Sequence, residues 1–456
     1  MKPRLSDRIS ARLHVVAGGR RVALHDSTAG RVALVGEREW SVLRHADGTR
    51  DLDGLVEMAS RQSVRLSRGD AARWFDELIE VGLVEDPSRG PATPASCDEE
   101  SVLAPSRTIR HLPRYGFRCD GAGSCCRIYP TTLFDEPDAL RARALVPEVM
   151  EGASDASRVF TPARGSRGLT TDQAGAAFVG LAVAMVDGAC AYLGDRGCRV
   201  HEAGGGSAKP MGCRLYPAHF VDDGTEVRVT VVPECACVFR SANDPEATGP
   251  LLEATTTDEL PASAHIRRLA KDVLIDANVT WSRERYLAWH QRHEARIFRD
   301  APTDAVRELL SLSSELAASH EAGASRPGSE QQELDVELGE LASRAKRHLD
   351  LQQSWRAPTD LSLIVPRWIA AAVESPAIDS FGSTIARDEA LYLRAVVFGH
   401  LWLDGDGSLA VELRRRAARV VVARRLVSAA RDAAGQANAS LLAHPLALVE
   451  AASRWL

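Results

Sequence analysis

Cysteine is the residue type in this chain whose number and spacing could support chemistry. Of the nine cysteines, all but Cys97 lie between positions 119 and 237, and none occurs in the long stretch that follows. In order, this set consists of Cys119, Cys125, Cys126, Cys190, Cys198, Cys213, Cys235 and Cys237. We therefore expect these eight thiols to act together.

The N-terminal residues and the apolar runs indicate the redox state of these thiols. Residues 1–12 are charged and lack an apolar core, so they do not resemble a secretory signal. The longest uncharged apolar run, 174–186, is shorter than the roughly 20 residues of a membrane helix. We therefore expect a cytoplasmic protein with reduced thiols, which favours metal binding over disulfides. Soft thiolates select zinc or an iron–sulfur cluster over hard cations.

Cys125 and Cys126 are adjacent, which bears on how many centres the thiols could form. Neighbouring side chains point to opposite faces of a strand and lie about 100° apart on a helix. The two are therefore not expected to take equivalent positions around one small tetrahedral ion. Either one of them is not a ligand, or the eight sulfurs serve two centres, because a 4Fe-4S cluster uses four. Structural zinc sites, a catalytic iron–sulfur cluster and reactive or regulatory thiols remain open.

The elements that must position these thiols predict an α+β fold. Within residues 10–86, the runs 21–24 and 31–34 alternate as paired strands do. Three helical stretches follow, and the third is expected to begin after Ser67, with Asp70 completing a capping box, and to end at Gly82. Strands followed by three helices in this spacing predict a winged-helix-like domain.

The rest of the chain is predicted to hold a linker and two further domains. Residues 87–106 are rich in Pro, Ala, Ser and Gly, as linkers are, and contain Cys97. Residues 107–243 form the cysteine-rich domain, whose short strands and glycine-rich connections are expected to need metal in order to fold. From 255 to 456 the pattern is helical throughout, with a polar break at 318–332, so an all-α domain is predicted.

The order of the cysteines resembles a known family. It is similar to the zinc- or iron-chelating cysteine-cluster (CxxCxxCC) family, and most similar to its flagellin lysine-N-methylase branch. The matching residues are Cys190-Ala-Tyr-Leu-Gly-Asp-Arg-Gly-Cys198-Arg-Val-His, followed by Cys213-Arg-Leu-Tyr-Pro. The resemblance covers residues 112–240 well and implies methyl transfer from S-adenosylmethionine to protein lysines. One departure is Ala122, which stands where the family has the second cysteine of its first box and makes Cys237 the candidate replacement.

The first domain resembles a different family. It is similar to the peptide-binding domain of pyrroloquinoline-quinone biosynthesis, also called the RiPP recognition element. The matching features are the strand pair, Asp47-Gly48-Thr49-Arg50 and Gly82-Leu83-Val84. The resemblance implies that residues 10–86 bind an extended leader peptide as an added strand, beside the third helix. A purely structural accessory domain is the alternative.

Charge argues against nucleic acid and membrane partners. The chain has 56 basic and 62 acidic side chains and a net charge of −6, so no overall field attracts polyanions. The third helix carries two basic residues, Arg68 and Arg73, and four acidic residues, namely Asp70, Asp76, Glu77 and Glu80. This excess of negative charge disfavours a DNA-binding helix.

Together these patterns predict a metal-cluster protein that modifies a peptide or protein. Lysine N-methylation is the first expectation for the reaction, and redox tailoring of a ribosomally made peptide is the second. A non-catalytic, zinc-stabilised adaptor that binds peptide is the alternative from another class. The sequence assigns no catalytic base, and no residue pattern in it indicates a pocket for the methyl donor.

Overall fold

A computed structural model shows a mixed fold of helices and strands, as the coarse fold class predicts. It describes the chain except for these residues: 7–8, 17–18, 27–30, 62, 81, 87–105, 120, 122, 129–132, 152–158, 165–177, 187, 261–263, 265, 277–278, 301–303, 320–329, 353–360, 375–382, 404–406, 434–443 and 454–456. Cys97, Ala122 and the linker up to residue 105 therefore lie outside the described residues.

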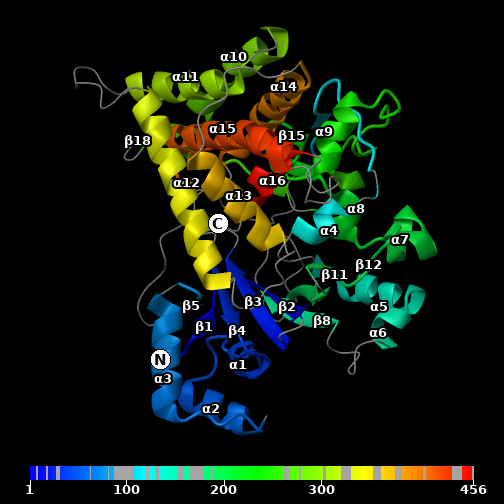
Figure 1. The fold of residues 1–456 in the computed structure, drawn as a ribbon, viewed down its shortest axis with the longest axis vertical. Helices are drawn as coiled ribbons and strands as arrows, with labels where there is room; N and C mark the ends of the chain where they lie inside the picture. The colour runs from blue at the N-terminus through cyan, green and yellow to red at the C-terminus, as the bar shows by residue number, and fades with distance from the viewer. Residues whose placement is uncertain are drawn as a thin grey trace.

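The N-terminal elements lie at the lower end of the molecule (Figure 1) and match the predicted order of strands and helices. The strands are β1 (Arg4–Leu5), β2 (Ile9–Val16), β3 (Gly19–Asp26), β4 (Arg31–Val35) and β5 (Val84–Glu85), and the helices are α1 (Glu37–Leu43), α2 (Leu52–Arg61) and α3 (Arg68–Glu80). The antiparallel pairing of β3 with β4 is confirmed. The additional strand β2, which the sequence analysis does not predict, pairs with β3 along its whole length.

The ends of α3 are as predicted. The Ser67 hydroxyl accepts a hydrogen bond from the backbone N–H of Asp70 at 3.1 Å and donates one to the Asp70 carboxylate at 2.6 Å. This satisfies an N–H that has no partner within the helix. Gly82 has a φ of +74°, the left-handed conformation in which glycine commonly ends a helix.

The cysteine-rich region extends the N-terminal sheet, so residues 10–86 are not separate from the rest. Its strand β10 runs parallel to β2, and the sheet has the order β11-β10-β2-β3-β4. The strand β1 likewise begins before residue 10 and pairs with β5. The outer edge of this sheet is therefore β4.

The cysteine-rich region consists of short elements, as predicted. Its strands are β6 (Ile109–His111), β7 (Leu133–Phe134), β8 (Phe160–Arg164), β9 (Phe178–Val183), β10 (Met185–Val186), β11 (Ala189–Cys190), β12 (Leu193–Gly194), β13 (Gly197–Cys198), β14 (Ala218–Asp222) and β15 (Val227–Val231). Its helices are α4 (Ser124–Ile128), α5 (Glu136–Leu145), α6 (Glu148–Glu151), α7 (Arg199–Gly204), the 3-10 turn η3 (Gly206–Ala208), α8 (Met211–Leu215) and α9 (Ala236–Asn243).

The expectation that the chain is helical throughout from residue 255 is wrong for residues 266–282. After the 3-10 turn η4 (Thr257–Glu259), these residues form β16 (Ile266–Arg268), β17 (Asp272–Asp276) and β18 (Val279–Ser282). In β17, Val273 and Ile275 are buried and alternate with more exposed neighbours, which is the period of a strand. β16 joins the sheet β16-β14-β15-β6, so the third region shares a sheet with the second.

The remaining elements are helical. They are α10 (Arg283–Asp300), α11 (Ala305–Ala318), α12 (Glu330–Gln352), α13 (Leu361–Glu374), α14 (Ser383–Phe398), the 3-10 turn η5 (Leu401–Leu403), α15 (Leu409–Ala433) and α16 (Pro445–Ser453). The predicted break at 318–332 falls between α11 and α12, although residues 320–329 lie outside the described part. Among the described residues, every helix is too short or too polar to cross a bilayer.

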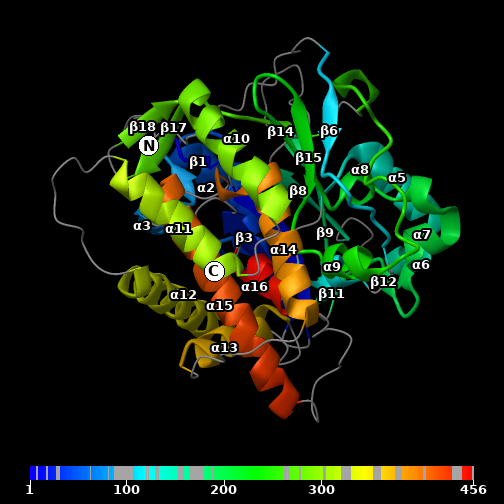
Figure 2. The ribbon, with the colours of Figure 1, turned by 90° about the horizontal axis from the view of Figure 1, so that it is seen from above.

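The largest apolar core joins the helices to the cysteine-rich region. It includes side chains of α10 to α16, and also Cys235, Val238 and Phe239 at the start of α9. Seen from above (Figure 2), α10, α11, α14 and α15 gather on one side, and β6, β14 and β15 with α7 to α9 lie on the other. The helical part is thus packed directly against the end of the cysteine-rich region.

This core contains a hydrogen-bonded group of buried aromatic residues. The Trp402 Nε1–H donates to the Tyr286 hydroxyl at 2.7 Å, so the Tyr286 O–H donates to His400 Nδ1 at 2.8 Å. His290 Nε2–H donates to the Val397 carbonyl at 2.8 Å. Burial lowers the pKa of His290 to about 4, and burial followed by the charge of His290 lowers that of His400. Both rings are therefore neutral in the folded protein near neutral pH.

The free energy of unfolding is expected to fall as the pH falls from about 6.5 towards 4. In this range the unfolded chain takes up a proton on His290 that the folded chain does not bind, so acid favours unfolding. His290 alone should account for about 2 kcal/mol between pH 7 and pH 5. Urea unfolding at several pH values measures this. His290→Gln should flatten the pH dependence and the exposed His201→Gln should not; an equal slope in both variants would contradict the assignment.

Candidate metal centre

Four of the predicted ligands, which we call the Cys213 group, come from four different elements. Cys126 lies on α4, Cys190 ends β11, Cys198 ends β13 and Cys213 lies on α8. The first three pack around one apolar cluster with Tyr192. Desolvation, and then the charges of Cys190, Cys126 and Cys198, raise the pKa of the Cys213 thiol. Cys213 is therefore within electrostatic reach of the other three.

A second set, which we call the Cys237 group, lies at the start of α9. Cys235 is the N-cap residue of this helix and Cys237 is in its first turn. The Cys119 thiol is hydrogen-bonded to Cys237, and this bond followed by burial raises the pKa of Cys119. For Cys237, the hydrogen bond to Cys119 lowers the pKa. The hydrogen bond from Cys237 to Cys235 and the burial of Cys237 raise it, and the overall result is a pKa raised to about 12.

The two groups are neighbours. The positive charge of Lys209 acts to lower the pKa of both Cys119 and Cys213, although larger effects raise both values. The Lys209 ammonium group is therefore within electrostatic reach of both groups. Lys209 is one of only four lysines in the chain, the others being Lys2, Lys271 and Lys346, and this rarity is the sequence signal that could have drawn attention to it. A cation beside thiolates reduces the cost of gathering negative charge.

Cys125 corrects one geometric expectation. Its sulfur is 4.0 Å from that of Cys126, both on α4. In a tetrahedral zinc site with Zn–S bonds of about 2.3 Å, two sulfurs are separated by about 3.8 Å. Adjacency therefore does not prevent this pair from approaching one ion, because the short helix brings both side chains to the same side.

Glycines allow the segment from Cys119 to Cys126, which we call the first cysteine box, to lie against the hairpin of β12 and β13. Gly121 and Gly123 have φ of +72°, and Gly197 has φ of +104°. A Cβ on Gly197 would lie 2.7 Å from the carbonyl oxygen of Gly121, closer than side-chain atoms approach backbone. Residue 197 therefore has to be glycine for this hairpin, which ends at Cys198, to lie against Gly121.

Gly197→Ala is expected to lower the free energy of unfolding by roughly 1–3 kcal/mol, because it adds a positive-φ strain to a steric clash. Gly206→Ala is the matched control, since its Cβ would meet nothing within 4 Å. The urea midpoints of the two variants measure the difference. Equal midpoints would mean that the hairpin and the first box are not in the contact described.

Neighbouring elements also hold the helices that carry the thiols. Asp138 on α5, which is 4% exposed, accepts a hydrogen bond at 2.7 Å from the N–H of Met211, the first residue of α8. Cys198 is the N-cap of α7, as Cys235 is of α9.

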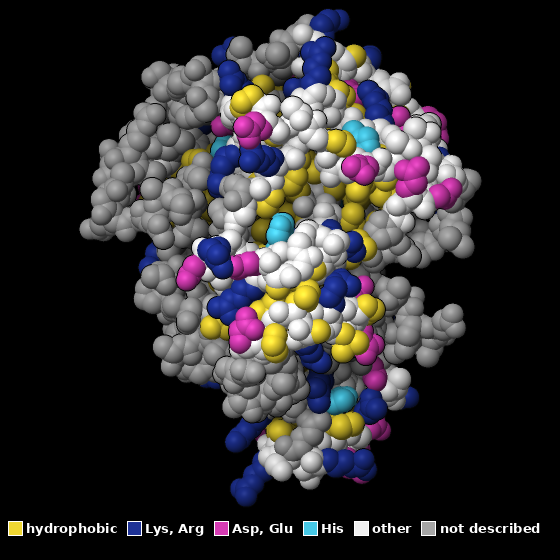
Figure 3. Space-filling view, turned by 90° about the vertical axis from the view of Figure 1, so that its right-hand side faces the viewer, with side chains coloured by type: hydrophobic (Ala, Val, Ile, Leu, Met, Phe, Trp, Pro, Cys, Tyr) yellow, Lys and Arg dark blue, Asp and Glu magenta, His cyan; other side chains and the backbone are white. Residues whose placement is uncertain are grey.

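The thiols suit a soft metal by their chemistry, although they do not form a closed ligand set as they stand. All eight described cysteines are thiols outside any disulfide. Within the described parts of the chain, no three His, Cys, Asp or Glu side chains are arranged around one ion position. Figure 3 shows the side of the molecule that carries α4, α7, α8 and α9. On this side, hydrophobic side chains, which are drawn in yellow and include cysteine, gather in a hollow bordered by charged side chains.

The segment before Cys119 belongs to this site, although the sequence analysis did not single it out. The Tyr115 hydroxyl donates to the carbonyl of Val238 at 3.1 Å, and the Arg118 N–H donates to Ser241 at 2.9 Å. These bonds fix residues 115–118 along α9, which brings Cys119 to Cys237. Burial, and then the charge of Cys235, raise the pKa of Tyr115.

Comparison with known proteins gives no relative for this chain. No family model matches it, and neither a curated protein nor a solved structure does.

Proposed function

We propose that this chain is a metal-cluster protein with two thiol-bound centres, which modifies a peptide or protein. The observation that supports this proposal is that cysteines from four separate stretches of the sequence form two adjacent groups, with four thiols in the Cys213 group and three in the Cys237 group. Thiolates prefer zinc or iron–sulfur clusters. Cys125 lies beside Cys126 of the first group, and we assign it to the second centre because the first already has four sulfurs and the two groups are neighbours.

The N-terminal sheet supports a role in substrate capture. In the order β11-β10-β2-β3-β4, one edge is already occupied by strands of the cysteine-rich region, and β4 is the outer strand at the other. An extended peptide that pairs with β4 would use its main chain for affinity and its side chains for selectivity. Residues 10–86 then act as a winged-helix-like peptide-recognition domain held close to the metal centre by β10.

Lysine N-methylation is the reaction we propose first, on the resemblance to flagellin lysine-N-methylase. S-adenosylmethionine would supply a methyl group whose C–S bond breaks as the lysine nitrogen forms its new C–N bond, with loss of one proton from nitrogen. The chain's own part is to hold the peptide along β4, close to the thiol groups. Redox tailoring of a ribosomally made peptide is the second candidate, because a recognition sheet is joined directly to soft-metal ligands.

Oxygen-free purification followed by elemental analysis and visible spectroscopy tests the centres. Two four-iron clusters would give brown protein with about eight irons and matching sulfide, and two structural sites would give about two zinc ions without colour. Either result supports two centres, and only the first supports a redox role. Protein that folds and carries no metal would contradict the proposal.

A methylation assay then tests the reaction separately. The protein is incubated with S-adenosylmethionine and a lysine-containing peptide, and the mass of the peptide is measured. A gain of one or more methyl groups supports methyl transfer. Metal-loaded protein that neither binds S-adenosylmethionine nor methylates would reject that reaction while leaving the metal centres in place.

A further inference from the structure

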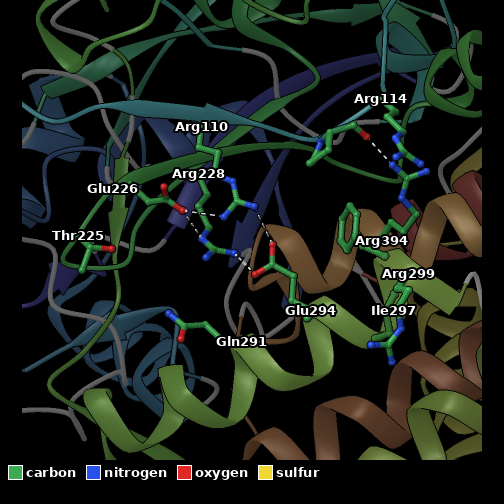
Figure 4. A pocket seen from close by; sticks show the side chains of 13 residues that line it. Arg110, Arg114, Thr225, Glu226, Arg228, Gln291, Glu294, Ile297, Arg299 and Arg394 are labelled. Carbon is green, nitrogen blue, oxygen red and sulfur yellow. Dashed lines mark hydrogen bonds and ion pairs between the residues drawn. The ribbon is translucent and has the colours of Figure 1, made fainter.

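A cleft on the other side of β15 contains an excess of arginine that the metal centres do not explain. It has a volume of about 720 Å³ and lies between the strands β6 and β15 and the helices α10 and α14 (Figure 4). Five arginines and two glutamates line it, so its lining side chains carry more positive than negative charge. In a chain with a net charge of −6, such a local excess marks a place where negative charge is favoured.

The two glutamates are already used at one end of the cleft. Glu226 lies 3.2 Å from both Arg110 and Arg228, and Glu294 lies 3.6 Å from Arg110 and 2.8 Å from Arg228. The dashed lines of Figure 4 join these four side chains into one group. This end of the cleft is therefore close to electrically neutral.

The other end of the cleft holds the guanidinium groups of Arg114 and Arg394. Arg394 donates to the carbonyl of Pro113 and lies over the ring of Phe298, 4.9 Å from its centroid, while its buried Nε has no hydrogen-bond partner. Within the described part of the chain, neither Arg394 nor Arg114 forms an ion pair. Burial, and then the charge of Arg114, lower the pKa of Arg394, so the two cations are close enough to repel each other.

The backbone holds this repulsive pair in place. Arg114 has a φ of +58°, which is uncommon for a residue with a Cβ. Arg299, on α10, is drawn on the same side of the cleft as Arg394 in Figure 4. Two neighbouring guanidinium groups that have no acidic partner among the described residues, those of Arg114 and Arg394, are typical of a site that recognises an oxyanion.

We propose that Arg114 and Arg394 bind the phosphate or carboxylate group of a small organic anion. Guanidinium groups offer paired N–H donors that match the oxygens of either group. Phe298 and Ile297 supply an apolar wall for the rest of the molecule, and the cleft is large enough for a ligand of nucleotide size. The proposal does not depend on the reaction at the thiols.

The cleft is nevertheless connected to the Cys237 group by the chain itself. Pro113 and Arg114 line the cleft, and the same segment continues through Tyr115, whose hydroxyl donates to Val238, to Cys119. A ligand that draws Arg114 towards Arg394 would therefore act on the segment that carries one of the proposed metal ligands.

Isothermal titration of the metal-loaded full chain with inorganic pyrophosphate and with citrate tests the site. We expect at least one of the two to bind at sub-millimolar concentration. Tighter binding of pyrophosphate would indicate a phosphorylated ligand, and tighter binding of citrate a carboxylated one. Failure of both anions to bind below about 1 mM would overturn the proposal.

Variants locate the binding. Arg114→Gln, at an exposed side chain, should weaken the tighter anion about tenfold, as expected for one charge-assisted contact. Arg394→Met should do the same, with circular dichroism to show that it folds. The control is Arg292→Gln, also exposed and on α10 but outside the cleft, which should change the affinity less than about twofold. Equal losses in Arg114→Gln and Arg292→Gln would overturn the site.

Discussion

Cys213→Ser is expected to remove the metal of one centre, leave the other in place and destabilise the cysteine-rich region. Cys213 interacts with Cys190, Cys126 and Cys198, so its loss leaves three thiols where four are proposed. Metal binding and folding are coupled in small metal sites, where the binding energy amounts to several kcal/mol or more. Metal content per chain should fall by about half, and soluble yield should fall with it.

The companion variant Cys237→Ser should remove the metal of the second centre. Cys125→Ser is expected to reproduce the effect of Cys237→Ser if Cys125 completes that centre, and the double variant should then lose no more metal than either single one. Cys97→Ser, in the predicted linker, is the matched control and should leave the metal content unchanged. Unchanged metal in Cys213→Ser would remove Cys213 from the ligand set.

Glu450→Ala is expected to lower the free energy of unfolding by about 3–5 kcal/mol, the usual effect of removing one partner of a buried ion pair. Glu450, 2% exposed on α16, lies 3.4 Å from Arg416 and 3.2 Å from Arg419, and accepts a hydrogen bond from the Tyr392 hydroxyl. Without it, the 4% exposed Arg416 guanidinium keeps its charge in the core and loses its carboxylate.

Urea unfolding of the full chain measures this loss. Glu374→Ala is the matched control, because the Glu374 carboxylate pairs with Lys346 at the surface, where the two side chains are 68% and 58% exposed. Exposed pairs contribute about 0–1 kcal/mol. Similar midpoints for the two variants would show that Glu450 is solvated in solution and that α16 does not close the core.

Local chemistry made several elements predictable from sequence. Ser67 and Asp70 cap α3 as expected, because a capping box involves residues three apart and needs no tertiary partner. The pairing of β3 with β4 follows from alternation on either side of a short turn. The eight cysteines likewise stand out in the sequence by their clustering, and their role as metal ligands stays a prediction.

By itself, the sequence determined which residues could bind a soft metal, that the fold mixes helices with strands, and where the capped helix α3 begins. Only the tertiary structure decided how the thiols divide, because Cys119 meets Cys237 across more than a hundred residues of chain. It also joined β10 to β2 and placed Arg114 beside Arg394. Such pairings depend on sheet order and helix packing, which bring distant residues together and leave no periodic pattern in the sequence.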